Sequence, residues 1–234
     1  MRNYFRKLLI VVGLCFFYTA SAQYRVNDAV GWLSLSVKQK ISKHISYRAM
    51  LRMRDGENFS SVRSWYIDGG LYYHFKKNLS VSLNYVYAPV REKNQYFRSF
   101  HQYYTSINKK INLNNYWYFS NRIIFQHTSS FFLVDEGYKP YSRTDLREKL
   151  SLNRRITRKD RIYIGDEVMT TLFTEITELR RNRFYLGLNH KFSKQLSVDA
   201  FFVLQSSCNR RINTNQYIYG LTLNYKFRKM IDDD

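Results

Sequence analysis

The 234-residue sequence has few of the residues that build disulfide-stapled or loop-rich proteins. It contains two cysteines, two prolines and nine glycines. Cys15 lies in an N-terminal segment that we expect to be cleaved. That leaves Cys208 alone and excludes an internal disulfide framework. The scarcity of Pro and Gly, beside 21 Tyr and 17 Phe, excludes a disordered chain and favours strands, which aromatic residues prefer.

Acidic residues are also scarce. Lys and Arg number 38 against 18 Asp and Glu, a formal net charge of +20. The segment 1–22 carries three positive and no negative charges, so a mature chain without it carries +17. Such an excess implies anionic partners such as nucleic acid, phosphorylated lipid or acidic solutes. The secretory segment described next argues against nucleic acid.

Only one long hydrophobic run occurs, and it lies at the N-terminus. "LLIVVGLCFFY" (8–18) follows the basic start "MRNYFRK" and precedes the A-x-A pattern that ends at Ala22. This is the layout of a secretory signal peptide over residues 1–22, with cleavage after Ala22. An uncleaved membrane anchor is the alternative, but the run falls well short of the ~20 residues that a spanning helix needs.

The rest of the chain alternates apolar and polar residues with period two. "LSVSLNYVY" (79–87), "LSVDAFFVL" (196–204) and "YIYGLTLNYKF" (217–227) place Leu, Val, Tyr and Phe on one side and mostly polar residues on the other. Residues 45–54 do the same, with arginines on the polar side. This pattern is typical of strands with one apolar face, and it rejects a helical repeat array.

Short polar hinges recur every 34 to 45 residues, and longer connections lie between them. We place the hinges at 42–44, 76–78, 112–115, 157–160 and 193–195. Short turns at one edge and longer loops at the other describe an up-and-down meander. Together with the signal peptide, they predict an all-β protein over residues 23–234: a transmembrane, antiparallel, up-and-down β-barrel of the bacterial outer membrane. A soluble secreted β-sandwich is the alternative, but its strands usually run ~5–6 residues.

The strand count is predicted as 10 to 12. About eleven runs look like strands, and bacterial single-chain barrels usually have an even number. Residues 23–28 would add a twelfth strand if they form one. Residues 96–110 are the weakest run, and losing them would give ten.

The C-terminal third resembles a known family. "IYIGDEVMTTLF" (162–173), "RRNRFYLGLNHKFSKQLSVDAFFVLQ" (180–205) and "YGLTLNYKF" (219–227) carry the resemblance. The family is an uncharacterised one of outer-membrane β-barrels, a domain of unknown function found mainly in Bacteroidetes-type bacteria. The resemblance implies fold and location and no activity. Tyr225 and Phe227 also resemble the terminal signal that the barrel-assembly machinery reads, with a short tail, 228–234, after them.

The inward face predicts a basic lumen. If the apolar residues face lipid, six cations that we single out as anion-binding candidates point inward: Arg48, Arg52, Arg147, Lys149, Arg181 and Arg183. Inward acids are fewer, namely Asp68, Asp145, Glu167 and Asp199. A basic lumen draws anions and sets selectivity, which predicts a small anion-preferring channel or binding barrel for anionic solutes. The alternative is a structural barrel whose lumen is closed by ion pairs.

A third interpretation is enzymatic. His127 and Ser129 in "FQHTSS" lie two apart and share a strand face. They resemble the His-x-Ser pair of outer-membrane phospholipases and lipid A deacylases, in which His serves Ser as general base. Asn, which usually follows in those families, is replaced here by Ser130. Asp145 on the next strand is the one residue to suggest as the third member.

Lipid contacts complete the expected partners. Lys93, Arg98, Arg210 and Arg211 fall near predicted outer loops, where they suit lipopolysaccharide phosphates and other outer-membrane lipids. The sequence shows no metal-binding, phosphate-loop or cofactor motif, so we expect no metal and no cofactor.

Overall fold

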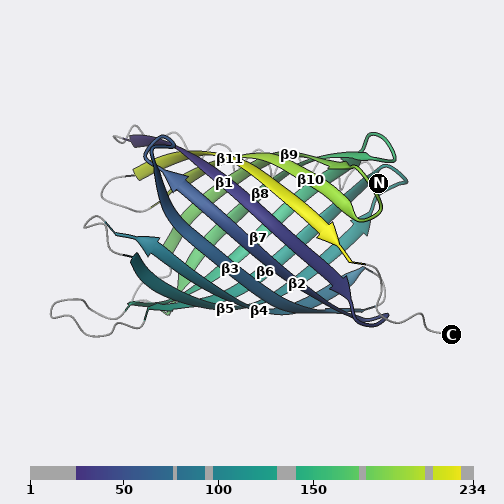
Figure 1. Cartoon of the computed structure of the whole chain (residues 1–234), viewed down its shortest axis with the longest axis horizontal. Coiled ribbons are helices and arrows are strands. Elements are labelled where there is room, and N and C mark those ends of the chain that lie inside the picture. Colours follow the sequence, from purple (N-terminus) through teal and green to yellow (C-terminus); the bar gives the residue numbers. More distant parts are fainter. Residues whose placement is uncertain are drawn as a thin grey trace.

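The computed structural model describes residues 25–75, 78–92, 97–130, 141–173, 178–208 and 213–227. These residues form a closed barrel of eleven strands (Figure 1). Its strands are β1 (Arg25–Lys40), β2 (Ile45–Gly56), β3 (Ser61–His74), β4 (Leu79–Arg91), β5 (Phe97–Asn112), β6 (Trp117–Ser130), β7 (Tyr141–Arg155), β8 (Asp160–Leu172), β9 (Glu178–Lys191), β10 (Leu196–Ser207) and β11 (Asn213–Lys226). In the part of the chain that the structure describes, no helix is long and apolar enough to cross a membrane.

Sequence neighbours pair antiparallel around the barrel, and the seam between β1 and β11 is parallel. In Figure 1 the purple β1 and the yellow β11 run side by side in the same direction. An up-and-down meander with an odd number of strands must close this way, because its first and last strands run the same way. The all-β barrel of 10 to 12 strands is confirmed, but antiparallel pairing throughout is corrected at this seam.

The structure assigns two segments whose place in the strand order the sequence left open. Residues 25–28 form the start of β1 and not a separate strand. The run judged weakest, 96–110, lies largely in β5, which spans 16 residues and pairs with both neighbours. The predicted signal peptide (1–22), with its cleavage after Ala22, and the tail 228–234 lie outside the described residues.

At one barrel end, here called the turn end, short turns connect the strands. In these turns a side-chain oxygen accepts the backbone amide three residues later. Ser42 and Ser193 hydroxyls accept the amides of Ile45 (3.1 Å) and Leu196 (2.9 Å), each three residues later. Thr157 accepts the amide of Asp160 at 2.9 Å in the same way. In the 113–116 turn an Asn side chain plays this part. A hydroxyl or amide oxygen in place of a backbone acceptor makes such tight turns, which explains why short polar hinges recur along the chain.

The outer surface of the barrel wall is apolar. Leu35, Leu71, Leu83 and Leu186 face outward, and Leu83 is 64 % exposed. Phe and Tyr rings cluster on this face near the turn end, where the Tyr73 and Phe75 ring centroids lie 4.6 Å apart. An exposed apolar wall with aromatic residues near its rim is the architecture of barrels that face lipid.

Part of the interior is filled by rings that lie over glycines. Val30, Trp32, Tyr185, Val203 and Ile218 form a buried cluster, with Tyr163 and Phe201 against it. Phe201 lies so close to Gly220 that a Cβ there would fall 2.0 Å from its ring, and Tyr163 covers Gly187 in the same way at 2.3 Å. Side chains from strands β8 to β11 and β1 therefore pack against one another on the inner face of the barrel.

Candidate functional site

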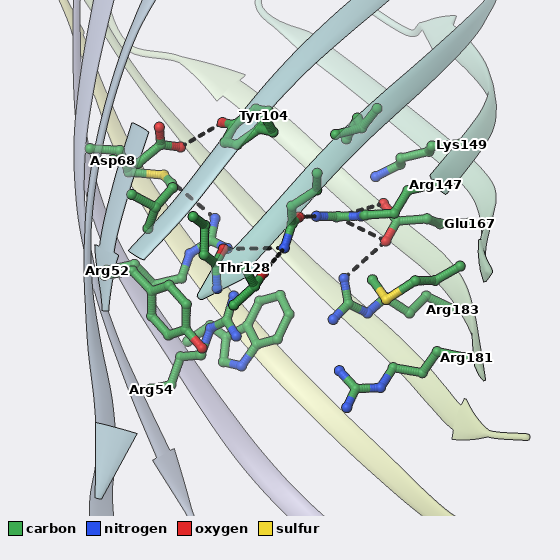
Figure 2. Close-up of a pocket in the computed structure, with 18 of the residues that line it drawn as sticks. Arg52, Arg54, Asp68, Tyr104, Thr128, Arg147, Lys149, Glu167, Arg181 and Arg183 are labelled. Carbon is green, nitrogen blue, oxygen red and sulfur yellow. Dashed lines mark hydrogen bonds and ion pairs between the residues drawn. The ribbon is translucent and has the colours of Figure 1, made fainter. Parts of the chain in front are cut away.

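The lumen holds a central cavity of about 740 Å³. Twelve Lys and Arg side chains line it against four acids. Figure 2 shows Arg52 and Arg54 reaching in from one side and Arg147, Arg181 and Arg183 from the other. All six cations singled out from the sequence line the cavity: Arg48, Arg52, Arg147, Lys149, Arg181 and Arg183. The predicted inward direction of these side chains is confirmed.

A continuous hydrogen-bonded belt runs around most of the inner wall. Each link joins one strand to the next, from β5 through β11 and across the seam to β1, over donor–acceptor distances of 2.5 to 3.4 Å. In order, its members are Gln102, Gln126, Arg147, Glu167, Arg183, Gln205, Gln216 and Asp28. Because the members hold one another, the belt fixes where its two arginines point.

The acids of the lumen do not balance its cations. Both carboxylate oxygens of Glu167 accept hydrogen bonds from Arg147, at 3.0 and 3.1 Å. One of them also accepts a bond from Arg183 at 2.9 Å. Asp145 is shared in the same way by Arg143 at 2.8 Å and Arg180 at 3.7 Å. One carboxylate neutralises one guanidinium, so each of these two clusters keeps a net positive charge.

Aromatic faces hold several of the lumen cations, including Arg183, which also pairs with Glu167. The Arg54 guanidinium lies 4.2 Å from the Trp32 ring centroid and 3.8 Å from that of Tyr66. Arg52 and Arg183 approach the same indole at 5.1 and 5.7 Å. Cation–π contacts position a guanidinium without using up its in-plane N–H donors.

Arg54 shows that unused capacity directly. Its Nε is buried and has no hydrogen-bond partner within the described part of the chain. Arg52 Nε donates to the Ser34 hydroxyl at 2.9 Å. Among the residues that the structure describes, no carboxylate forms an ion pair with Arg52. Lys149 is held similarly, with its ammonium 3.3 Å from the Tyr185 ring centroid. All three side chains line the central cavity, which is large enough for small ions.

A separate ion pair orders the opposite wall. Arg48 lies 3.4 Å from Asp68, and the Tyr104 hydroxyl donates to the same carboxylate at 2.9 Å. The fourth predicted inward acid, Asp199, accepts from the Tyr163 hydroxyl at 3.1 Å. All four acids predicted to face inward, Asp68, Asp145, Glu167 and Asp199, contact lumen-side residues.

The aromatic partners were the part of the site missed from the sequence. Trp32, Tyr66 and Tyr185 were not predicted to lie against lumen cations. The alternation along the strand could have placed Trp32 in the lumen, because it shares its face with Ser34 and Ser36, both on the inner wall.

His127 and Ser129 lie together on the outward face of β6, as predicted. The His127 ring bonds through Nδ1 to the Thr144 hydroxyl at 3.0 Å. Asp145, suggested as the third residue, faces the lumen, where it bonds to Arg143 and to Thr171. That suggestion is wrong, because adjacent residues of a strand point to opposite sides of the wall, and Thr144 takes the outward place.

The predicted assembly residues lie at the turn end of the seam. The Tyr225 and Phe227 rings face outward with centroids 5.0 Å apart. Of the predicted lipopolysaccharide contacts, Lys93, Arg210 and Arg211 lie outside the described residues. Arg98 extends to the lumen side, where it donates to Ser130 at 2.8 Å and lies 3.8 Å from Glu92.

A closed barrel with an apolar exterior and a charged, hydrogen-bonded interior defines the class, an outer-membrane-type β-barrel. The chain belongs to the family described as "Protein of unknown function (DUF2490)", whose model matches residues 29–217. The family resemblance drawn from the sequence is thereby confirmed. No curated protein matches the chain. Among solved structures, the beta domain of the Bordetella autotransporter Brka is similar at 13 % identity with a TM-score of 0.47. The match covers 74 % of this chain and 81 % of that one.

Proposed function

We propose that the protein is an outer-membrane barrel whose basic lumen admits and binds small anions. The observation that carries the proposal is the central cavity's twelve cations against four acids. Two of the lumen carboxylates, Glu167 and Asp145, are each shared by two arginines. A narrow, low-dielectric lumen of one sign raises the local concentration of counter-ions.

The chemistry of the lining favours carboxylate and phosphate groups. Guanidinium groups offer paired donors that match two oxygens at once. Arg52 and Arg54 on β2 and Arg183 on β9 converge on Trp32 and present such donors from two strands. An incoming anion would therefore meet charge that the aromatic contacts already hold in position.

A structural barrel with a closed lumen is the second candidate, and the belt of eight residues favours it. In that account, Glu167 and its arginines serve only to hold strands β6 to β10 together. The two accounts differ in one respect: the channel or binding barrel lets external anions reach Trp32, and the closed barrel does not. Among the residues that the structure describes, none around His127 favours the hydrolase, since Thr144 is its partner and Asp145 faces the lumen.

Anion access to Trp32 is measurable by fluorescence quenching. Trp65 and Trp117 are replaced with Phe, which leaves Trp32, a 6 % exposed lumen side chain, as the reporter. We expect iodide to quench it several times more strongly than caesium, because the lumen concentrates anions and repels cations. Arg52→Gln combined with Arg183→Gln is expected to remove most of this preference.

The matched control keeps Trp65, on the outward face, and replaces Trp32 and Trp117 with Phe. Trp65 is expected to show no such preference for iodide, since lipid or detergent covers that face. A folded Trp32 protein that neither ion quenches would contradict the open lumen and support the closed barrel.

The same proposal includes a location and partners. We place the barrel in the bacterial outer membrane, because its exposed wall is apolar over leucine-rich strands. Outer-membrane lipids and lipopolysaccharide would contact that wall, and the barrel-assembly machinery would act at Tyr225 and Phe227. Anionic solutes are the expected cargo, and nucleic acid is not.

A further inference from the structure

A second cavity of about 1120 Å³ opens at the turn end of the lumen, and we call it the vestibule. Five lysines line it: Lys38, Lys159, Lys191, Lys194 and Lys226. Three arginines join them, and Asp199 is the one acid in the described part of this lining. Eight cations against one acid leave a formal excess of seven positive charges. The vestibule adjoins the central cavity, since Arg48 and Asn224 line both.

Three of these cations stand side by side on the inner wall. Strand pairing aligns Lys226 on β11 with Lys38 on β1, and Lys38 in turn with Arg48 on β2. Neighbouring strands lie about 4.7–4.9 Å apart. Like charges at directly paired positions repel each other and destabilise a sheet. Anionic groups placed along this row would offset the repulsion.

A neutral ring holds two cations of this row in position. The Tyr72 ring centroid lies 5.7 Å from the Lys38 ammonium and 5.4 Å from the Arg48 guanidinium. Among the described vestibule cations, Arg48 alone forms an ion pair with a carboxylate, that of Asp68, at 3.4 Å. Asp199 accepts a hydrogen bond from a tyrosine hydroxyl at 3.1 Å instead. The charge of the vestibule is therefore positioned in advance and mostly not neutralised.

The kind of cation indicates the kind of anion. A lysine ammonium is a compact point charge that pairs with phosphate oxygens from any direction, whereas the planar arginine fork also matches carboxylates. Lysines are five of the eight vestibule cations. One phosphate group carries about two negative charges at neutral pH, which offsets only part of the excess. A ligand with several phosphates in a row fits both the charge and its arrangement.

We propose that the vestibule binds soluble anions that carry two or more phosphate groups, with successive phosphates along the row of Lys226, Lys38 and Arg48. Lys191 and Lys194, at the turn between β9 and β10, add positive charge beside that row. The inference rests on the proposed function, because it names the class of anion that the basic lumen takes up.

Isothermal titration calorimetry of the purified barrel in non-ionic detergent at low salt tests the ligand class. Tripolyphosphate should bind at least tenfold more tightly than orthophosphate, with one ligand per barrel, and pyrophosphate should fall between them. The affinity should drop at least tenfold in 1 M salt, where the Debye length is ~3 Å. Citrate, which has three carboxylates and no phosphate, should bind more weakly than pyrophosphate. Equal affinities for the three phosphates, or citrate binding as tight as that of pyrophosphate, would refute the assignment.

Two double variants locate the site. Lys38→Gln with Lys226→Gln should weaken tripolyphosphate binding at least tenfold. The ligand-free barrel should remain as stable or become more stable, because the repulsion within the row is relieved. Lys43→Gln with Lys109→Gln removes the same charge at the turn end, and neither lysine lines the vestibule. This control pair should change the affinity less than twofold, and equal losses in the two pairs would show only general attraction to a basic barrel.

Two further measurements separate the source of the phosphates and the proposed function. Lipid A in mixed micelles should not displace tripolyphosphate, because its acyl chains stay outside the barrel wall, and displacement would contradict a soluble ligand. Tripolyphosphate binding by a barrel whose Trp32 is not quenched by iodide would overturn the open lumen and leave the vestibule site intact. Iodide quenching without the preference for tripolyphosphate would do the reverse.

Discussion

Replacing Glu167 with Ala is expected to lower the free energy of unfolding by about 3–5 kcal/mol, the usual cost of removing one partner from a buried ion pair. Glu167 is 3 % exposed and accepts bonds from Arg147 and Arg183. Without it, the buried Arg183 and the half-buried Arg147 remain beside Lys149 with no neutralising charge. The belt would also lose its link between β7 and β9. Urea unfolding followed by tryptophan fluorescence measures the change.

The matched control is Glu148→Ala on the neighbouring strand. Glu148 faces outward, is exposed and has one amide partner, Asn121, at 2.8 Å. Its removal should leave the unfolding free energy unchanged or raise it slightly, because a carboxylate on the outward, lipid-facing wall does not stabilise the barrel. Equal effects at Glu167 and Glu148 would show that the belt does not stabilise the barrel.

The second large effect is expected from Gly220→Val. A Cβ at this position would fall 2.0 Å from the Phe201 ring, within a buried cluster that includes Val203 and Ile218. The ring has to leave its place, and overpacking of this kind costs about 3 kcal/mol. The same urea titration is expected to show a lower unfolding midpoint for the variant.

Gly69 offers a control on another strand. No atom lies within 4 Å of a Cβ built there, because Gly69 faces outward. Gly69→Val should leave stability unchanged or raise it, since Val suits strands better than Gly. If Gly220→Val behaved like Gly69→Val, close packing of Phe201 on the inner wall would be refuted.

Much of the fold was predictable because two features of a barrel leave a pattern in the sequence: the alternation of strand residues and the polar turns between strands. Alternation fixed which side chains face in, so the directions of Arg147, Arg183 and Glu167 were predicted correctly. The hinges were found because each tight turn needs a side-chain oxygen to hold its amides, as Ser42, Thr157 and Ser193 do. Both patterns involve residues close together in the sequence, so they can be recognised in a single sequence.

What could not be predicted depends on contacts between strands far apart in the sequence. The parallel seam follows from the exact strand count, which one ambiguous run can change. The contact of Arg183 on β9 with Trp32 on β1 depends on curvature that only closure creates. Asp145 was suggested for an outward site although the alternation already placed it inward, and the structure shows it bonded to Arg143 and Thr171 in the lumen.

The most direct test of the basic lumen is the reversal potential of the purified protein, as residues 23–234, in a planar bilayer under a salt gradient. Anion selectivity is predicted, together with a clear shift toward non-selectivity when Arg181 and Arg183 are both replaced with Ala. Both side chains line the central cavity, and Arg183 contacts Glu167 and Trp32 as well. Cation selectivity, or no conductance from protein shown to be folded, would contradict the account.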